Sequence, residues 1–187
     1  EIAQCLVGSE MCIRDSNMTS AEKGTAMHTF MQYCDYDNAR DDLETEIARL
    51  ISYSYLTAEQ AKVLDRGKLT TFFTSDFAKR IFCGDRVYRE FKISAFVPVK
   101  EIENTDFDDK VLVQGIADCV FEENGELVLV DYKTDRVQSE EELLCEYKNQ
   151  IAFYKYAVEK SLKKPVKQAA LYSFYLNKPC LLYTSPS

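Results

Sequence analysis

Apolar residues in the first part of the chain recur at the spacing of amphipathic helices. Residues 26–34 (AMHTFMQYC) predict one helix, and residues 39–55 predict another with its apolar positions on one face. Thr57 and Gln60 have the pattern of a capping box, which begins a short helix that runs to residue 64. The segment 74–76 (TSD) supplies caps for a further helix over residues 77–82. We therefore expect a helical N-terminal part.

The pattern then changes to that of strands. Residues 87–99, 111–121 and 126–133 are rich in β-branched and aromatic residues. A long helix is predicted over residues 139–162, with acidic residues in its first turn and lysines at its end. Alternating apolar residues over 168–176 predict a last strand. Strands that flank one long helix indicate an α/β fold.

The two ends of the chain lack a usable period. Residues 1–16 (EIAQCLVGSEMCIRDS) and 180–187 (CLLYTSPS) resemble translated sequencing-adapter strings, and both are set aside as an artefactual leader and tail. The alternative is that they are genuine but poorly patterned termini. Residues 17–179 then form the one domain that this length allows.

Composition narrows the class of protein. Hydrophobic residues make up 46% and charged residues 29%, as in ordinary globular proteins. No apolar run has the length of a membrane span and no signal peptide is evident, so we expect a cytoplasmic protein without a membrane partner. Seven widely spaced cysteines without a CxxC pair favour neither disulfides nor a zinc or iron–sulfur site. Cys119 and Cys145 are interpreted as packing residues.

The net charge of -8 counts against a domain that grips nucleic acid through its overall field. It does not exclude a nuclease, because acidic residues are what a magnesium site requires and DNA can be held by a local patch or a partner. One candidate patch consists of four lysines near the end of the long helix: Lys160, Lys163, Lys164 and Lys167. The alternative is a solvated helix end with favourable charges.

The candidate chemistry lies in a predicted hairpin. Asn124-Gly125 is a strong two-residue turn signal, and it sets a register in which paired residue numbers sum to 249. Asp118 then lies opposite Asp131, with their Cβ atoms about 5 Å apart on one face of the sheet. Two like charges there need neutralisation, and a divalent cation such as Mg²⁺, for which Mn²⁺ can substitute, would provide it.

Lys133 follows Asp131 by two residues and therefore shares its face. The apolar run over residues 127–130 indicates a central strand from whose end the carboxylate emerges. Lys133 could orient or help deprotonate an attacking water, or neutralise charge on a phosphorus-centred transition state. The alternative is an ordinary Asp–Lys pair on a sheet surface, because Asp-x-Lys alone is a weak signal.

The run QGIADCVFEENGELVLVDYKTDRV (residues 114–137) resembles motifs II and III of the PD-(D/E)XK nuclease superfamily in its RecB-like branch. Within that branch it is similar to the C-terminal nuclease domain of AddA-type subunits of bacterial AddAB helicase–nucleases. Three further segments support the resemblance, which covers residues 24–176: GTAMH (24–28), VYREFKIS (87–94) and QIAFY (150–154). It implies a restriction-endonuclease-like fold, with a mixed central sheet flanked by helices and a helical N-terminal part.

The resemblance also assigns roles. It implies that one or two Mg²⁺ ions are held by His28, Asp118 and Asp131, with the backbone carbonyl of Tyr132 as a further ligand, and that no iron–sulfur cluster is bound. Glu90 corresponds to an auxiliary acidic residue on the first core strand. The alternatives are a histidine satisfied in the core, and a surface glutamate paired with a neighbouring basic residue.

Gln150 and Tyr154 correspond to the family's Q-x-x-x-Y motif, which reaches the scissile phosphate or the catalytic lysine. They are one helical turn apart and share a face. The alternative is that this face only packs on the sheet, through Tyr147, Ile151, Tyr154 and Val158.

By resemblance, the chain is a DNA exonuclease domain of an ATP-dependent helicase–nuclease that resects double-strand breaks. The resemblance implies DNA and an AddB-type subunit as partners. Because the sequence has no GxxxxGK[ST] phosphate loop, the helicase region is expected in another part of the parent chain. Two alternatives stay open: a stand-alone RecB-like exonuclease, and an inactive domain that binds DNA or braces a partner.

Overall fold

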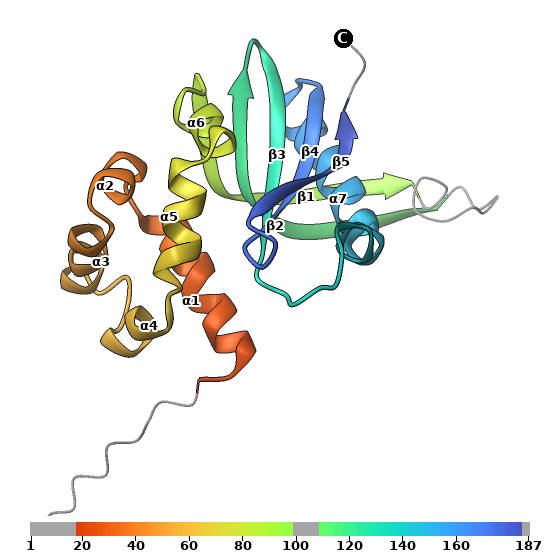
Figure 1. The fold of residues 1–187 in the computed structure, drawn as a ribbon. Helices are drawn as coiled ribbons and strands as arrows, with labels where there is room; N and C mark the ends of the chain where they lie inside the picture. The colour runs from red at the N-terminus through yellow and green to blue at the C-terminus, as the bar shows by residue number, and fades with distance from the viewer. Residues whose placement is uncertain (1–17, 99–108, 185–187) are drawn as a thin grey trace, which may run out of the picture.

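The computed structural model describes residues 18–98 and 109–184 (Figure 1). Six helices come first, followed by three strands, a long helix and two further strands: α1 (Ser20–Tyr33), α2 (Tyr36–Asp41), α3 (Leu43–Ser52), α4 (Ala58–Val63), α5 (Arg66–Thr74), α6 (Asp76–Phe82), β1 (Arg86–Pro98), β2 (Lys110–Glu123), β3 (Glu126–Lys133), α7 (Glu140–Leu162), β4 (Val166–Ser173) and β5 (Lys178–Thr184).

The strands form one mixed sheet in the order β1-β2-β3-β4-β5. Among the described strands, only β3 and β4 are parallel, and α7 is the crossover that joins them. The other neighbouring pairs are antiparallel. The expected α/β fold with a mixed central sheet flanked by helices is confirmed.

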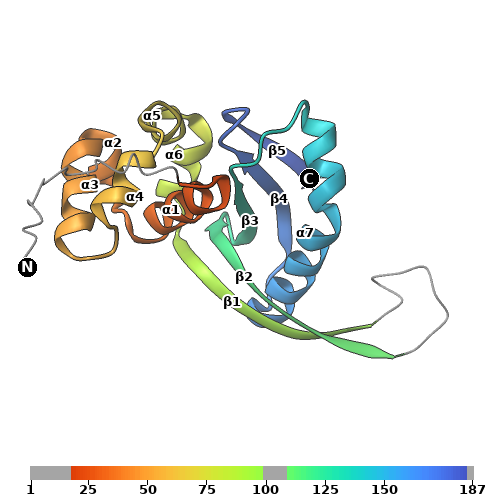
Figure 2. The same cartoon turned by 90° about the horizontal axis from the view of Figure 1, so that it is seen from below.

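Helices cover both faces of the sheet (Figure 2). The block α1–α6 packs on one face around Phe30, Phe72 and Tyr132, which are at most 2% exposed. Helix α7 packs on the other face, where Leu129, Ile151 and neighbouring apolar residues form a second core. The middle strand β3 is therefore buried on both faces, as its unbroken apolar run over residues 127–130 predicts.

Side-chain caps fix most of the helix starts in the N-terminal block. The Thr57–Gln60 capping box is present and begins α4. The predicted helix over residues 39–55 is wrong in detail, because the chain breaks at Asp42, which is extended and whose side chain caps α3 at the backbone N–H of Thr45. Helix α5, which the sequence pattern did not predict, begins in the same way at Asp65.

The C-terminal strand corrects another expectation. Residues 180–184, set aside as part of a tail, belong to β5, which pairs antiparallel with β4. Cys180 is fully buried in the core beneath α7. In the described structure these residues are therefore packed as a strand of the sheet. The expected leader over residues 1–16 lies outside the described residues.

Two of the four lysines of the proposed patch are neutralised by carboxylates. Lys164 pairs with Glu122, and Lys167 Nζ lies 2.6 Å from Glu123 Oε2. Both acids lie next to the β2–β3 turn, at the other end of these strands from Asp118 and Asp131. The patch therefore offers little free positive charge near the candidate site.

The helices of the described part of the chain include no candidate for a membrane-spanning segment.

Candidate active site

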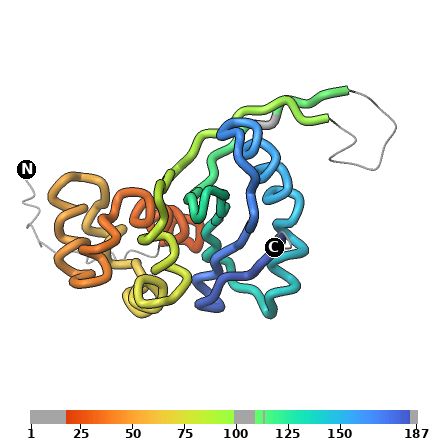
Figure 3. Tube along the Cα trace, turned by 90° about the horizontal axis from the view of Figure 1, so that it is seen from above, coloured from red at the N-terminus to blue at the C-terminus, as the bar shows by residue number. Residues whose placement is uncertain are grey.

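The predicted hairpin register is correct up to one point. Strands β2 and β3 pair from Glu123↔Glu126 to Cys119↔Val130, all on the sum of 249. The ladder ends there, one residue before Asp118 and Asp131. Beyond that point β1 and β2 continue together as a long two-stranded arm, while β3 keeps its pairing with β4 (Figure 3). The candidate site lies in this fork.

Asp118 bridges the fork through its side chain. Its Oδ2 accepts the backbone N–H of Tyr132 at 2.7 Å, so a carboxylate oxygen takes a hydrogen bond that the ladder no longer provides. Its Oδ1 lies 3.2 Å from Nδ1 of His28 on α1. Asp118 therefore joins β2, β3 and the N-terminal helical block, which a simple opposed pair of carboxylates would not do.

Asp131 is the most deeply buried charged group of the site, at 3% exposure. Its Oδ2 lies 2.9 Å from Lys133 Nζ in an ion pair, but no donor among the described residues is aligned to hydrogen-bond this atom. Burial and the nearby charge of Asp118 raise the pKa of Asp131 to about 6, against the opposing effect of Lys133. The fold thus holds a carboxylate in surroundings that disfavour its charged form.

Lys133 is held from three sides. Besides Asp131, its Nζ donates to Gln150 Oε1 at 3.2 Å and lies 3.7 Å from the ring centroid of Tyr147. Tyr147 in turn donates from its hydroxyl to Asp135 at 3.1 Å. The helical pattern indicated only a packing role for Tyr147. Its position three residues before Gln150, on the same helix face, could have indicated that it also lies at the site. The ring face favours the ammonium ion and fixes its position.

Gln150 and Tyr154 form the next part of the network. Gln150 Nε2 donates to the Tyr154 hydroxyl at 3.0 Å. Tyr154 lies against Gly115 of β2, where an added Cβ would come within 2.7 Å of the tyrosine ring. The functional and packing interpretations of this helix face are therefore compatible, because Ile151 and Val158 are buried beside these polar residues.

Glu90 lies where the strand alternation shifts. Tyr88 and Phe91 both pack toward α7 although they are three residues apart, and Glu90 between them has φ of +50°. The β1–β2 register is the same on both sides of this point, so neither strand has an extra residue, and the ladder is interrupted where Glu90 and Asp118 face each other. Burial and Asp118 raise the pKa of Glu90, while His28 opposes them. Glu90 is thus directed to the site and is not paired with Arg89, which donates to Gln32 and Cys34.

His28 completes the group. Burial disfavours its protonated form, but the hydrogen bond and the charges of Asp118 and Asp131 outweigh this effect and raise its pKa.

The neighbouring thiols differ from each other: Cys119 is fully buried, as predicted, whereas Cys145 is exposed, so its interpretation as a packing residue is wrong.

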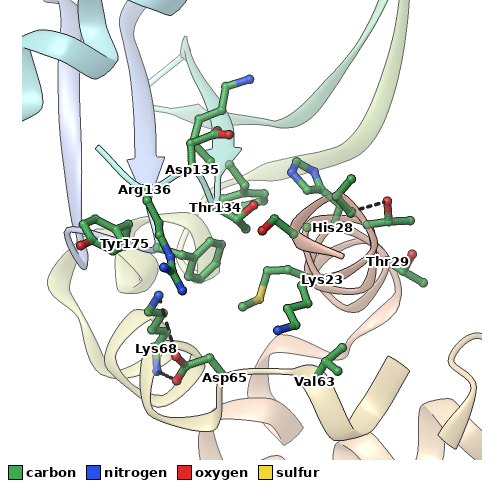
Figure 4. Close-up of a pocket in the computed structure, with 18 of the residues that line it drawn as sticks. Lys23, His28, Thr29, Val63, Asp65, Lys68, Thr134, Asp135, Arg136 and Tyr175 are labelled. Carbon is green, nitrogen blue, oxygen red and sulfur yellow. Dashed lines mark hydrogen bonds and ion pairs between the residues drawn. The ribbon is translucent and has the colours of Figure 1, made fainter. Parts of the chain in front are cut away.

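A cavity of about 1120 Å³ opens beside these residues. His28, Glu90 and Lys133 line one end of it, and α1, α4, α5 and the segments after β3 and β4 form its walls (Figure 4). A ligand can therefore approach the fork from the side of the helical block.

Comparison with protein families decides the classification. A model described as "PD-(D/E)XK nuclease superfamily" matches residues 5–182. The chain belongs to this superfamily. The matched range includes residues 5–16 and 180–182, which belong to the two ends that were expected to be artefactual.

Several curated relatives are, by name, subunits of an ATP-dependent helicase/nuclease. The protein from Clostridium perfringens (strain ATCC 13124) is 39% identical over 178 residues, that from Clostridium beijerinckii 36% over 173, and that from Geobacillus kaustophilus 36% over 176. The matches cover 88%, 86% and 87% of this chain. They cover only 14% of each relative. The chain is thus a PD-(D/E)XK nuclease domain similar to one region of these much longer proteins.

The residues of this PD-(D/E)XK domain fit a divalent cation chemically. Asp118 and Asp131 are hard oxygen donors, and Oδ2 of Asp131, which has an ion pair with Lys133 but no aligned hydrogen bond among the described residues, could accept a further cation. They do not form a ready-made cage: within residues 18–98 and 109–184, no three His, Cys, Asp or Glu side chains are grouped as metal ligands. The His28–Asp118 and Asp131–Lys133 contacts would have to open. Tyr132 has its ring buried, so only its backbone could contribute.

Proposed function

We propose that this domain hydrolyses DNA phosphodiester bonds with Mg²⁺, as the nuclease part of an ATP-dependent helicase–nuclease. Membership of the PD-(D/E)XK superfamily supports a nuclease. The observation that carries the proposal is the meeting of Asp118, Asp131 and Lys133 in the fork beside an open cavity. A bracing domain would have no use for a buried carboxylate whose charge the fold disfavours.

In this proposal, Asp118 and Asp131 hold one or two Mg²⁺ ions, and Mn²⁺ can substitute. His28 is a further ligand and the Tyr132 carbonyl another. The bound metal would supply Lewis-acid polarisation of the phosphate and a more acidic water. Because Nδ1 of His28 lies 3.2 Å from Asp118 Oδ1, the imidazole would have to turn from this contact to share a metal with Asp118.

Lys133 provides the positive charge that the chain itself contributes. Its ammonium can hydrogen-bond the attacking water or a phosphate oxygen, and it stabilises the negative charge that builds up in the transition state. The Lys133 side chain is held in place between α7 and β3 by Gln150, Tyr154 and Tyr147. Glu90, on the rim of the cavity, is proposed as an auxiliary acidic residue that orients water or His28.

The whole-protein context is also a proposal. The relatives' printed name joins a helicase and a nuclease. We propose that this domain receives DNA from such a helicase region during resection of double-strand breaks in the cytoplasm, beside an AddB-type partner. We expect the chain to hydrolyse no ATP by itself, because its sequence has no GxxxxGK[ST] phosphate loop.

The test is cleavage of 5′-labelled single-stranded DNA by the 187-residue chain with Mg²⁺, with Mn²⁺ and with EDTA. Asp131→Asn and Lys133→Met are the test variants. Asp85→Asn, an exposed carboxylate near the β2–β3 turn, is the matched control. We expect metal-dependent cleavage by the wild type and the control, and a loss of at least about 100-fold in both test variants.

Two outcomes would overturn the proposal. Cleavage that persists in Asp131→Asn would mean that the activity does not come from this site. A folded wild-type chain that neither binds Mg²⁺ in calorimetry nor cleaves would favour the inactive bracing domain. A chain that binds Mg²⁺ but cleaves only when a helicase–nuclease complex lacking its own nuclease is added would assign the activity to the assembled enzyme.

A further inference from the structure

The cavity beside the fork is lined by more basic than acidic residues, although the chain as a whole is acidic. The whole sequence has 23 Lys and Arg against 31 Asp and Glu. The cavity lining has five Lys or Arg residues against three Asp or Glu residues. Four of these cations come from segments outside the catalytic group: Lys23 on α1, Lys62 on α4, Lys68 on α5 and Arg136 after β3.

Few of these four cations are used in ion pairs, so they can bind an anionic ligand. Among the described residues, Lys23, Lys62 and Arg136 make no ion pair, and Lys68 has only a long one, with its Nζ 3.8 Å from Asp65. Figure 4 shows Lys23, Lys68 and Arg136 extending into the same open space. Lys164 and Lys167 differ from them, because they form ion pairs with Glu122 and Glu123 next to the β2–β3 turn.

The carboxylates of the lining are fewer than its cations. Asp65 and Asp135 keep their charge while they accept hydrogen bonds from the backbone N–H of Lys68 at 3.0 Å and from the hydroxyl of Tyr147. Glu90 lies at the catalytic end, beside His28 and Asp118. The part of the cavity away from the fork therefore has four cations against two carboxylates and is positive, as the path of a phosphate backbone requires.

An exposed aromatic ring lies in the same part. Tyr175, in the turn between β4 and β5, is 43% exposed, and Lys68 Nζ lies 5.4 Å from its ring centroid. Aromatic faces beside cations are typical of single-strand binding, because unpaired bases can stack on the ring while phosphates meet the lysines. In a duplex the base faces are already stacked on one another, so the ring would have no base to receive.

We infer that this cavity is the approach path of a single nucleic-acid strand, held by Lys23, Lys62, Lys68 and Arg136 and stacked on Tyr175. The inference rests on the proposed function and adds to it which strand state is bound and by which wall. The path runs from α4 and α5, past α1, to Lys133 in the fork. The N-terminal helices thus bind substrate besides supplying His28.

The test measures binding apart from cleavage. Fluorescence anisotropy of a labelled oligo(dT) of about 12 nucleotides, a length within the usual single-strand site sizes, gives Kd in EDTA at several salt concentrations with the full chain. The test variants are the double change Lys68→Ala and Arg136→Ala, and the single change Tyr175→Ala. The matched controls are Lys148→Ala with Lys160→Ala, two exposed lysines of α7 outside the cavity lining, and Tyr175→Phe, which keeps the ring.

We expect the double variant to bind at least about 10-fold more weakly. Its slope of log affinity against log salt should be smaller by about 1.4, since each lost contact to a single strand removes about 0.7. Tyr175→Ala should weaken binding roughly fivefold or more, and Tyr175→Phe and the lysine control should bind as the wild type does. A blunt duplex of the same length should bind more weakly and respond little to Tyr175→Ala.

Three results would overturn the inference: no binding of oligo(dT) by the folded wild type, an equal loss in the lysine control, or a duplex that depends on Tyr175 as strongly as the single strand does. The two proposals fail in different ways. Binding without metal-dependent cleavage would leave the strand path standing and refute the nuclease proposal for this chain. Cleavage with unchanged Kd and KM in the cavity variants would do the reverse.

Discussion

Replacing Asp131 by Asn should stabilise the fold while it destroys cleavage. The native structure holds this carboxylate at 3% exposure beside the charge of Asp118, and its ion pair with Lys133 offsets this only in part. Asn has the same shape but no charge, so it removes the unfavourable charge and keeps the packing. A residue selected for chemistry and not for stability is expected to behave in this way.

The magnitude follows from the pKa of Asp131, which rises from 3.8 to about 6 on folding. Such a rise corresponds to about 3 kcal/mol of lost stability when the group is ionised in both states. Because the folded pKa lies above the unfolded one, the stability is complete below about pH 4 and is lost as the pH rises through about 6. Asn does not titrate, so its advantage should grow over the same interval. The pKa already includes the favourable contact with Lys133, so the expected gain near neutrality stays at about 3 kcal/mol.

The assay is urea unfolding of both chains in EDTA at several pH values from about 4 to about 7.5, which span the two pKa values, with Asp85→Asn as the control. We expect equal stabilities at the acidic end and a gap that opens toward neutrality, while the control follows the wild type. Added Mg²⁺ should then raise the midpoint of the wild type and not that of Asp131→Asn. A variant less stable than the wild type near neutrality, or a gap of the same size at the acidic end, would refute the reasoning.

Three further predictions concern the surroundings of the site. Gly115→Ala should lower kcat about tenfold and cost about 1–3 kcal/mol in thermal unfolding, since its Cβ would lie 2.7 Å from the Tyr154 ring; an unchanged kcat would contradict the supporting role of Tyr154. Tyr172→Phe should be neutral or stabilise the chain by about 1 kcal/mol in urea unfolding, because the buried hydroxyl has no hydrogen-bond partner among the described residues; a clear loss of stability would contradict this. The ion pair with Arg80 lowers the pKa of Glu123 to about 2. Glu123→Gln should therefore lower the free energy of unfolding by about 1–2 kcal/mol near neutrality, and this difference should shrink as the pH falls from about 5 toward 2. A difference that stays constant with pH would contradict the ion pairing.

Much of the candidate site could be predicted because it depends on local signals. The Asn124-Gly125 turn fixes the hairpin register, and the register brings Asp118 close to Asp131. Helical spacing then places Gln150 and Tyr154 on one face of α7, over Lys133. The roles of these residues stay predictions, but their proximity follows from short-range geometry that a sequence contains.

The fork itself could not be predicted from the same signals. Whether β2 continues beside β3 past Cys119 depends on the twist of the long β1–β2 arm and on the shift at Glu90. Residue 90 is a glutamate, and no turn sequence marks its positive φ. The contact of His28 with Asp118 joins residues 90 positions apart, and only the packing of α1 on the sheet brings them together.

The missed elements have a related cause. Helix α5 has only Leu69, Phe72 and Phe73 as buried residues in nine, so its apolar period is short, yet Phe72 packs edge-on against Tyr132 and Tyr172 in the core. Strand β5 was not expected because its sequence resembles a foreign tail. Burial of Cys180 shows that an apolar segment of ordinary pattern can pair with an available strand edge.

The helical block bears on how an acidic domain can bind a polyanion at all. With a net charge of -8, the long-range field of the chain repels nucleic acid, and carboxylates around a metal site repel it further. Binding then requires cations placed within a Debye length of the phosphates and shielded from the rest of the surface. The cavity provides this arrangement, since Lys68 stands on α5, whose Phe72 packs on Tyr132 and Tyr172 of the sheet, and Lys23 and Lys62 stand on α1 and α4, which pack on each other. The same packing that hides the apolar face of β3 therefore sets the positive wall opposite its catalytic end.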